Sequence, residues 1–119
     1  MAMISSRMHG IIDYLVVIFL WISPSAFGLT GNAAIFTYVL GAVHLLLTIM
    51  TDFSLGMIRL IPFRIHGLIE LIVSLALVMT AYYFGDIGDM LARNFYYGFA
   101  GAVFLTWLLT DYKKNRLRK

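Results

Sequence analysis

The stretch RMHGIIDYLV at residues 7–16 returns in altered form as RIHGLIELIV at residues 64–73. Each copy places an arginine, a histidine, a glycine and a carboxylate at the start of a long apolar run. The alignment continues without a gap, so that residues 7–28 pair with residues 64–85. An internal match of this length predicts that the chain contains two copies of one structural unit.

The segments that follow also correspond. GAVHLLLTIMTDF at residues 41–53 matches GAVFLTWLLTDY at residues 101–112 when one residue is deleted from the second copy. Each copy therefore begins with R-x-H-G-x-I-[DE] and ends with T-D-[FY]. We predict two helical hairpins, repeat 1 at residues 7–53 and repeat 2 at residues 64–112, related by an axis along the membrane normal because both start on the same side.

The composition is that of a membrane protein. Of 119 residues, 61% are hydrophobic and 13% are charged, and the mean hydropathy is +0.88. Windows 11–29, 33–51 and 66–84 approach or exceed the roughly 18 apolar residues that cross a bilayer, and a fourth at 94–110 is shorter but uncharged. We expect an all-α membrane protein whose four transmembrane helices form a bundle from two parallel helical-hairpin repeats, with residues 1–119 as a single domain.

Several functional classes are disfavoured. The chain has no cysteine, which removes disulfides, thiolate metal sites, covalent haem attachment and cysteine nucleophiles. Four spans use most of the residues, and no nucleophile–base pair, phosphate loop or dinucleotide fingerprint is visible. We therefore expect neither an enzyme nor a resident cofactor, and the basic tail is too short to predict nucleic-acid binding.

The distribution of positive charge predicts the orientation. Of the nine Lys and Arg residues, only Arg93 falls between the third and fourth spans. Arg7, Arg59, Arg64 and the basic tail at residues 113–119 all lie on the other side. The positive-inside rule then predicts that both termini are cytoplasmic. The tail is interpreted as a topology anchor, with attraction to anionic lipid as the alternative.

Residues that could carry chemistry stand at the head of each repeat. His9 and Asp13 are four residues apart, as are His66 and Glu70, so on a helix each pair shares one face. An unpaired Asp costs about 2.5–3.5 kcal/mol at the centre of a membrane helix and less toward the interface. We therefore predict a polar cluster at the cytoplasmic end: Arg7, His9, Asp13, Arg64, His66 and Glu70, with Asp52 and Asp111 as partners from the helix ends.

Four interpretations of this cluster remain open. It can lock the ends of the two hairpins together through ion pairs and hydrogen bonds, which is the favoured one. It can bind a divalent metal, with His9, Asp13, His66 and Glu70 as candidate ligands, since these are reasonable nitrogen and oxygen donors. A haem between the two histidines has no supporting spacing. The fourth is a proton or small-solute track through Asp13, Glu70 and His44, which would be asymmetric.

A second motif carries a family resemblance. Trp21, Ser23 and Pro24 form W-x-S-P near the end of an apolar helix, and Phe27 and Gly28 follow as F-G. This pattern resembles the SPW-repeat family of small bacterial membrane proteins, although serine follows Ser-Pro where that family has tryptophan. The resemblance implies an integral protein of the prokaryotic inner membrane without an assigned activity.

The sequence thus favours a membrane scaffold or interaction protein whose polar cluster joins the two repeats. Four short spans enclose little interior, so we also expect a homo-oligomer in the lipid bilayer. Proton-coupled or small-solute conduction is the first alternative, and metal or haem binding is the second. No pattern identifies a protein partner.

Overall fold

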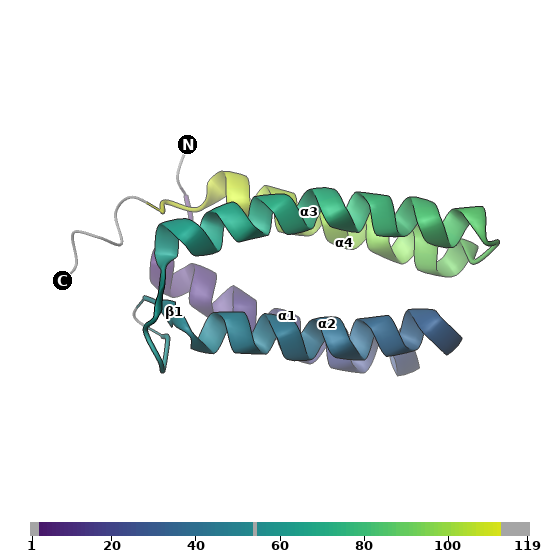
Figure 1. Cartoon of the computed structure of the whole chain (residues 1–119), viewed down its shortest axis with the longest axis horizontal. Coiled ribbons are helices and arrows are strands. Elements are labelled where there is room, and N and C mark those ends of the chain that lie inside the picture. Colours follow the sequence, from purple (N-terminus) through teal and green to yellow (C-terminus); the bar gives the residue numbers. More distant parts are fainter. Residues whose placement is uncertain (1–2, 54, 113–119) are drawn as a thin grey trace.

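The computed structural model describes residues 3–53 and 55–112, so the basic tail at residues 113–119 lies outside the described part. Within it the chain forms two helical hairpins that lie side by side (Figure 1). The first hairpin packs α1 against α2, and the second packs α3 against α4. The helices are α1 (Ser6–Phe27), α2 (Gly31–Ile49), α3 (Phe63–Asp86) and α4 (Met90–Leu109).

Three of these helices are long and apolar enough to cross a membrane. They are α1, α2 and α3, with 22, 19 and 24 residues and mean hydropathies of 1.8, 1.7 and 1.8. This supports the prediction of an integral membrane protein. The sequence of α4 also has 20 residues, but it carries Arg93, Asn94 and two tyrosines, which lower its hydropathy. The fourth span therefore stays a prediction.

Local sequence signals explain where the helices begin and end. The Ser5 side chain accepts a hydrogen bond from the first turn of α1 at 3.2 Å, and Asp89 caps α4 by accepting from the Ala92 backbone at 3.1 Å. Gly28 ends α1 in the left-handed conformation, with φ of 80°, which glycine adopts without strain. Its N–H bonds to the carbonyl of Pro24. Pro24 thus lies in the last turn of a helix that continues past it.

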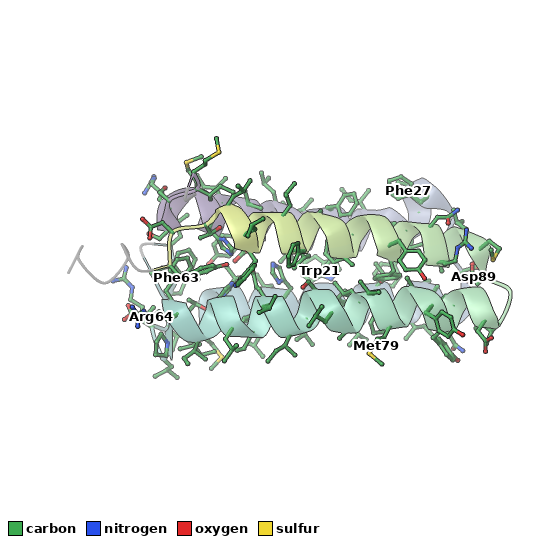
Figure 2. The ribbon with its side chains drawn as sticks, turned by 90° about the horizontal axis from the view of Figure 1, so that it is seen from above. Trp21, Phe27, Phe63, Arg64, Met79 and Asp89 are labelled. Carbon is green, nitrogen blue, oxygen red and sulfur yellow. The ribbon has the colours of Figure 1, made fainter. Side chains whose placement is uncertain are left out.

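Short backbone pairings bring four helix ends together at one end of the bundle. Strands β1 (Thr51–Asp52) and β2 (Ile61–Pro62) pair in parallel and hold the end of α2 beside the start of α3. Ile4 pairs with Thr110, which holds the start of α1 beside the end of α4. We call this the cluster end. Figure 2 shows Arg64 at the cluster end and Asp89 at the opposite end.

One apolar core lies between the two hairpins toward the opposite end. Side chains of at most 2% exposure come from α1, α3 and α4 and meet Ala33 of α2. Outside this core many large apolar side chains are exposed, as illustrated by Met79 (73%) in Figure 2. An apolar exterior of this extent is what a lipid environment requires. The buried core includes Leu20, Leu77, Ala81, Phe84 and Tyr96.

Candidate functional site

Four ionisable side chains are buried together at the cluster end. His9 and Asp13 extend from α1, and His66 and Glu70 extend from α3, with exposures of 0%, 2%, 0% and 5%. The spacing of four residues places each pair on one helix face, and both faces point toward the other hairpin. We call these four residues the His/carboxylate cluster. They are four of the six residues of the predicted polar cluster.

The cluster is a ring in which nitrogen and oxygen atoms alternate. Glu70 Oε2 lies 3.0 Å from His9 Nε2 and 2.9 Å from His66 Nε2. Asp13 Oδ2 lies 3.2 Å from His9 Nε2 and 3.1 Å from His66 Nε2. One donor atom from each residue falls within 4.8 Å of all the others. Both histidines therefore present Nε2 to the same two carboxylates.

The other nitrogen of each histidine contacts a threonine of the opposite hairpin. His9 Nδ1 lies 2.8 Å from Thr110 Oγ1, and His66 Nδ1 lies 2.7 Å from Thr51 Oγ1. Each threonine hydroxyl donates its own proton to the carbonyl four residues earlier, in the last turn of the preceding helix, at 2.6 Å. The hydroxyl oxygens must then accept from the histidines, so both rings carry their proton on Nδ1.

This tautomer determines what the centre of the ring can contain. A neutral imidazole protonated on Nδ1 has a lone pair on Nε2, which here would face the lone pairs of two carboxylates. Such an arrangement repels unless positive charge lies between the atoms. Protons on both Nε2 atoms would form two imidazolium–carboxylate contacts, and a metal cation would form a four-ligand site. The geometry admits both chemistries.

An aromatic ring packs against the glycine that follows each histidine. The Phe53 ring lies directly on Gly10, and the Tyr112 ring lies where a side chain on Gly67 would be, within 2.9 Å. The Tyr112 hydroxyl donates to Glu70 Oε1 at 3.3 Å. Burial, and next the Glu70 carboxylate, raise the pKa of Tyr112, so this hydroxyl stays a proton donor.

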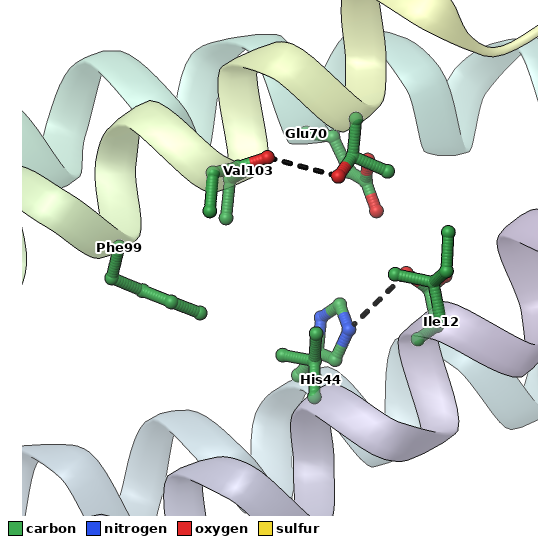
Figure 3. A pocket seen from close by; sticks show the side chains of 9 residues that line it. Ile12, His44, Glu70, Phe99 and Val103 are labelled. Carbon is green, nitrogen blue, oxygen red and sulfur yellow. Dashed lines mark hydrogen bonds and ion pairs between the residues drawn. The ribbon is translucent and has the colours of Figure 1, made fainter.

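His44 of α2 adds a fifth polar group beside the cluster. Its Nε2 lies 3.5 Å from Asp13 Oδ1, and its side chain is 18% exposed. A cavity of about 140 Å³ adjoins it and is bordered by both carboxylates and by apolar residues of α1 and α4. Figure 3 shows His44 and Glu70 on opposite sides of this cavity, with Phe99 and Val103 along its wall. The three residues of the predicted track thus border one cavity.

The predicted arginines do not enter the cluster. Arg7 and Arg64 are exposed, and none of the ion pairs found in residues 3–53 and 55–112 contains either of them. The reason is the helical period: residues two apart do not share a face. Because the histidines point inward, the arginines two positions earlier point outward, away from the cluster.

The threonines of the T-D-[FY] segments contact the cluster histidines. Asp52 and Asp111 follow Thr51 and Thr110 and are half-buried. Their backbone is extended at or near this point, so neighbouring side chains point in opposite directions. The terminal threonine of the neighbouring hairpin is one of the partners that the sequence offers the cluster, and the same Thr-Asp pair stands near the end of both repeats.

Comparisons with protein families, with curated proteins and with solved structures find no match to this chain. The resemblance to the SPW-repeat family therefore stays a prediction. Its motif residues have a local role in the structure, because Trp21 packs on Gly41 and donates to the Tyr38 carbonyl at 3.1 Å. The Ser23 hydroxyl donates to the Phe19 carbonyl at 2.6 Å. Function must be argued from the site itself.

Proposed function

We propose that this protein is a four-span scaffold of the prokaryotic inner membrane, in which the His/carboxylate cluster joins two hairpin repeats at the cytoplasmic end. One observation carries the proposal. Each cluster histidine contacts its own carboxylate, the carboxylate of the other hairpin and a threonine of the other hairpin. Such a set of contacts requires both hairpins, so it is complete only in the assembled bundle.

The membrane environment makes this joint specific. The interior of a bilayer offers no water to an unpaired polar group, and removing one partner of a buried ion pair costs about 3–5 kcal/mol. Any other placement of the hairpins would keep the pair within each helix but lose the contacts of each histidine with the carboxylate and the threonine of the opposite hairpin. The cluster thus favours a single arrangement of the bundle over all alternatives.

The fourth span and the orientation belong to the same proposal. A helix of 20 residues such as α4 extends about 30 Å, which matches the hydrocarbon thickness of a bilayer. It packs antiparallel against α3, which is apolar enough to span. Arg93 near its start would then lie at the outer interface, and Arg7, Arg59 and Arg64 would lie at the cytoplasmic interface.

Association into a homo-oligomer is proposed for the outward surface of the bundle. Gly98 and Gly101 of α4 are exposed and have no atom within 4 Å of where a side chain would begin. Small residues on a lipid-facing helix allow the backbone of a second helix to approach closely. A second copy of the chain is the partner that this surface would serve.

The joint is tested by neutralising both carboxylates in the double variant Asp13→Asn with Glu70→Gln. Its thermal midpoint in detergent is expected to fall well below that of the wild type, since the free-energy loss is about 3–5 kcal/mol. Asp86→Asn is the control, because Asp86 is exposed at the opposite end of α3. A double variant that melts with the wild type would contradict the joint.

Conduction is the second candidate, favoured by the shared cavity of Asp13, His44 and Glu70. Beyond that cavity the bundle is filled by Leu20 and Tyr96, both 0% exposed, so a path across the membrane would have to pass the apolar core. If conduction is the function, the same double variant keeps its melting behaviour and loses pH-gradient-driven flux in liposomes.

A further inference from the structure

We propose that the His/carboxylate cluster binds one divalent transition-metal ion, coordinated by Nε2 of His9, Nε2 of His66 and one oxygen each from Asp13 and Glu70. The inference rests on the proposed joint and names the ligand that completes it. The ion would lie between α1 and α3 and bond to both hairpins at once.

The spacing of the four atoms fits such an ion. In a tetrahedral zinc site the bonds are about 2.0–2.2 Å long, so any two ligand atoms are roughly 3.3–3.6 Å apart. Here the four nitrogen–oxygen contacts around the ring are 2.9–3.2 Å. To hold the ion, the four ring contacts would lengthen by roughly 0.1–0.7 Å, and the nitrogen–nitrogen and oxygen–oxygen separations, which are at most 4.8 Å, would adjust to the same range.

The histidines are already oriented as metal ligands. A histidine bound to a metal usually donates its other ring N–H to an oxygen, which fixes the tautomer and the ring direction. Thr110 and Thr51 accept these bonds from His9 and His66, and each hydroxyl is itself held by its bond to a helix carbonyl. The lone pairs of both Nε2 atoms therefore point to the centre of the ring.

One orphaned atom favours a cation over protons. If both Nε2 atoms carried protons, those protons would be well directed toward the same Glu70 oxygen. Asp13 Oδ2 is buried and has no hydrogen-bond partner, although it lies 3.1–3.2 Å from both nitrogens. Protons on the two histidines would thus leave this carboxylate oxygen unsatisfied. A cation at the centre has no directional requirement of that kind and would bond to all four atoms.

Charge and donor type define the class of ion. Two carboxylates and two neutral imidazoles bring a charge of minus two, so a divalent ion makes the buried site neutral, which a low-dielectric interior favours. Two imidazole donors select transition metals such as Zn²⁺, Mn²⁺, Fe²⁺ or Co²⁺ over Mg²⁺ and Ca²⁺. Four protein ligands close the tetrahedral shell, as in structural zinc sites. The ion is therefore assigned a structural role.

The test is metal analysis of the full chain, purified in detergent without a metal-affinity column. Elemental analysis is expected to give about one transition-metal ion per chain. Protein treated with a chelator should regain about one equivalent of Zn²⁺, Mn²⁺, Fe²⁺ or Co²⁺ in equilibrium dialysis, and its thermal midpoint should rise on reloading. Asp13→Asn should lose this rise and most of the bound metal, whereas Asp86→Asn should keep both.

The possible failures can be told apart. Folded wild-type protein that takes up none of these ions at millimolar concentration would overturn the metal site, while low melting of the carboxylate double variant would still support an ion-pair joint. Stoichiometric metal with unchanged melting of that variant would support the site and overturn the joint. If Asp13→Asn does not fold, Thr110→Val is the second variant, because it keeps all four ligands and should weaken metal binding at least tenfold.

Discussion

The two hairpins supply the same contacts to the His/carboxylate cluster from positions that the sequence alignment pairs. They differ in the additional polar group that contacts each carboxylate. His9 and His66 are paired by the sequence alignment, and each contacts the threonine that ends the opposite repeat. Asp13 and Glu70 are also equivalent, and each contacts both histidines. The repeated residues thus form a closed ring to which both hairpins contribute alike.

The remaining partner of each carboxylate comes from a position that is polar in one hairpin only. Asp13 lies beside His44, whose equivalent is the exposed Phe104. Glu70 accepts from Tyr112, whose equivalent is Phe53. The ring contacts are thus common to both hairpins, whereas the outer partner of each carboxylate, His44 or Tyr112, is specific to one hairpin.

The largest loss of stability is expected for the double variant Thr51→Val with Thr110→Val, which removes the threonine contact of both histidines. Each replacement leaves a buried Nδ1–H without an acceptor, at a cost of about 1–3 kcal/mol. The double variant should therefore lose about twice the stability of either single variant in thermal or denaturant unfolding. If the hairpins are equivalent, the two single variants should cost the same within error.

Thr80→Val is the matched control, because the Thr80 hydroxyl is exposed and donates only to a carbonyl of its own helix. It should change stability little. A threonine variant at the cluster that behaves like Thr80→Val would show that the histidine contact contributes nothing to the joint, and a large difference between Thr51 and Thr110 would show that the halves are unequal.

A smaller effect is expected at the glycines that follow the histidines. Gly10→Ala should cost about 1–3 kcal/mol by overpacking, because the Phe53 ring that occupies its space is only 2% exposed. Gly67→Ala should cost less, since Tyr112 is only half-buried and its ring lies farther from the added methyl group than Phe53 does at Gly10. Unfolding measurements on both variants would show whether the buried Phe53 ring restricts its glycine more than the half-buried Tyr112 ring does.

The control for both is Gly98→Ala, at an exposed glycine with free space around it. Alanine has a better helix propensity than glycine by about 0.5–1 kcal/mol, so this variant should be neutral or slightly stabilised as a monomer. Equal costs at Gly10 and Gly98 would mean that the aromatic contact at the cluster does not restrict the site.

The sequence predicted the helices and the inward pairs because both depend on local spacing. Apolar windows of sufficient length predicted three spans that the structure supports, and a spacing of four residues placed His9 with Asp13 and His66 with Glu70. The same helical period would have excluded Arg7 and Arg64, which are two residues from the histidines. Their inclusion followed from charge pairing alone, without regard to helix face.

What the sequence could not predict depends on the distance between the hairpins. Whether Asp13 contacts only its own histidine or also His66 is decided by how closely α1 approaches α3, and no local pattern contains that distance. The contact of each histidine with the threonine of the opposite hairpin also depends on how the two hairpins are placed. It follows from the paired strand segments β1 and β2 and from the bridge between Ile4 and Thr110, which are too short to leave a signal in the sequence.

The smallest effect is expected for His44→Phe. This variant places in the first hairpin the residue type that the second hairpin has at the equivalent position, Phe104. His44 is half-buried and lies 3.5 Å from the nearer Asp13 oxygen, so the loss of stability should stay below about 1 kcal/mol. His44 is not one of the four proposed ligand residues, so bound metal should remain at about one ion per chain.

A lower metal content in His44→Phe would show that His44 of α2 is a fifth ligand. The metal could then not be enclosed by a tetrahedron of α1 and α3 ligands alone, and the site would be open toward the cavity. If His44→Phe instead keeps its metal and loses proton flux, the two functions belong to different residues. The joint would then depend on the His/carboxylate cluster, and conduction would depend on His44.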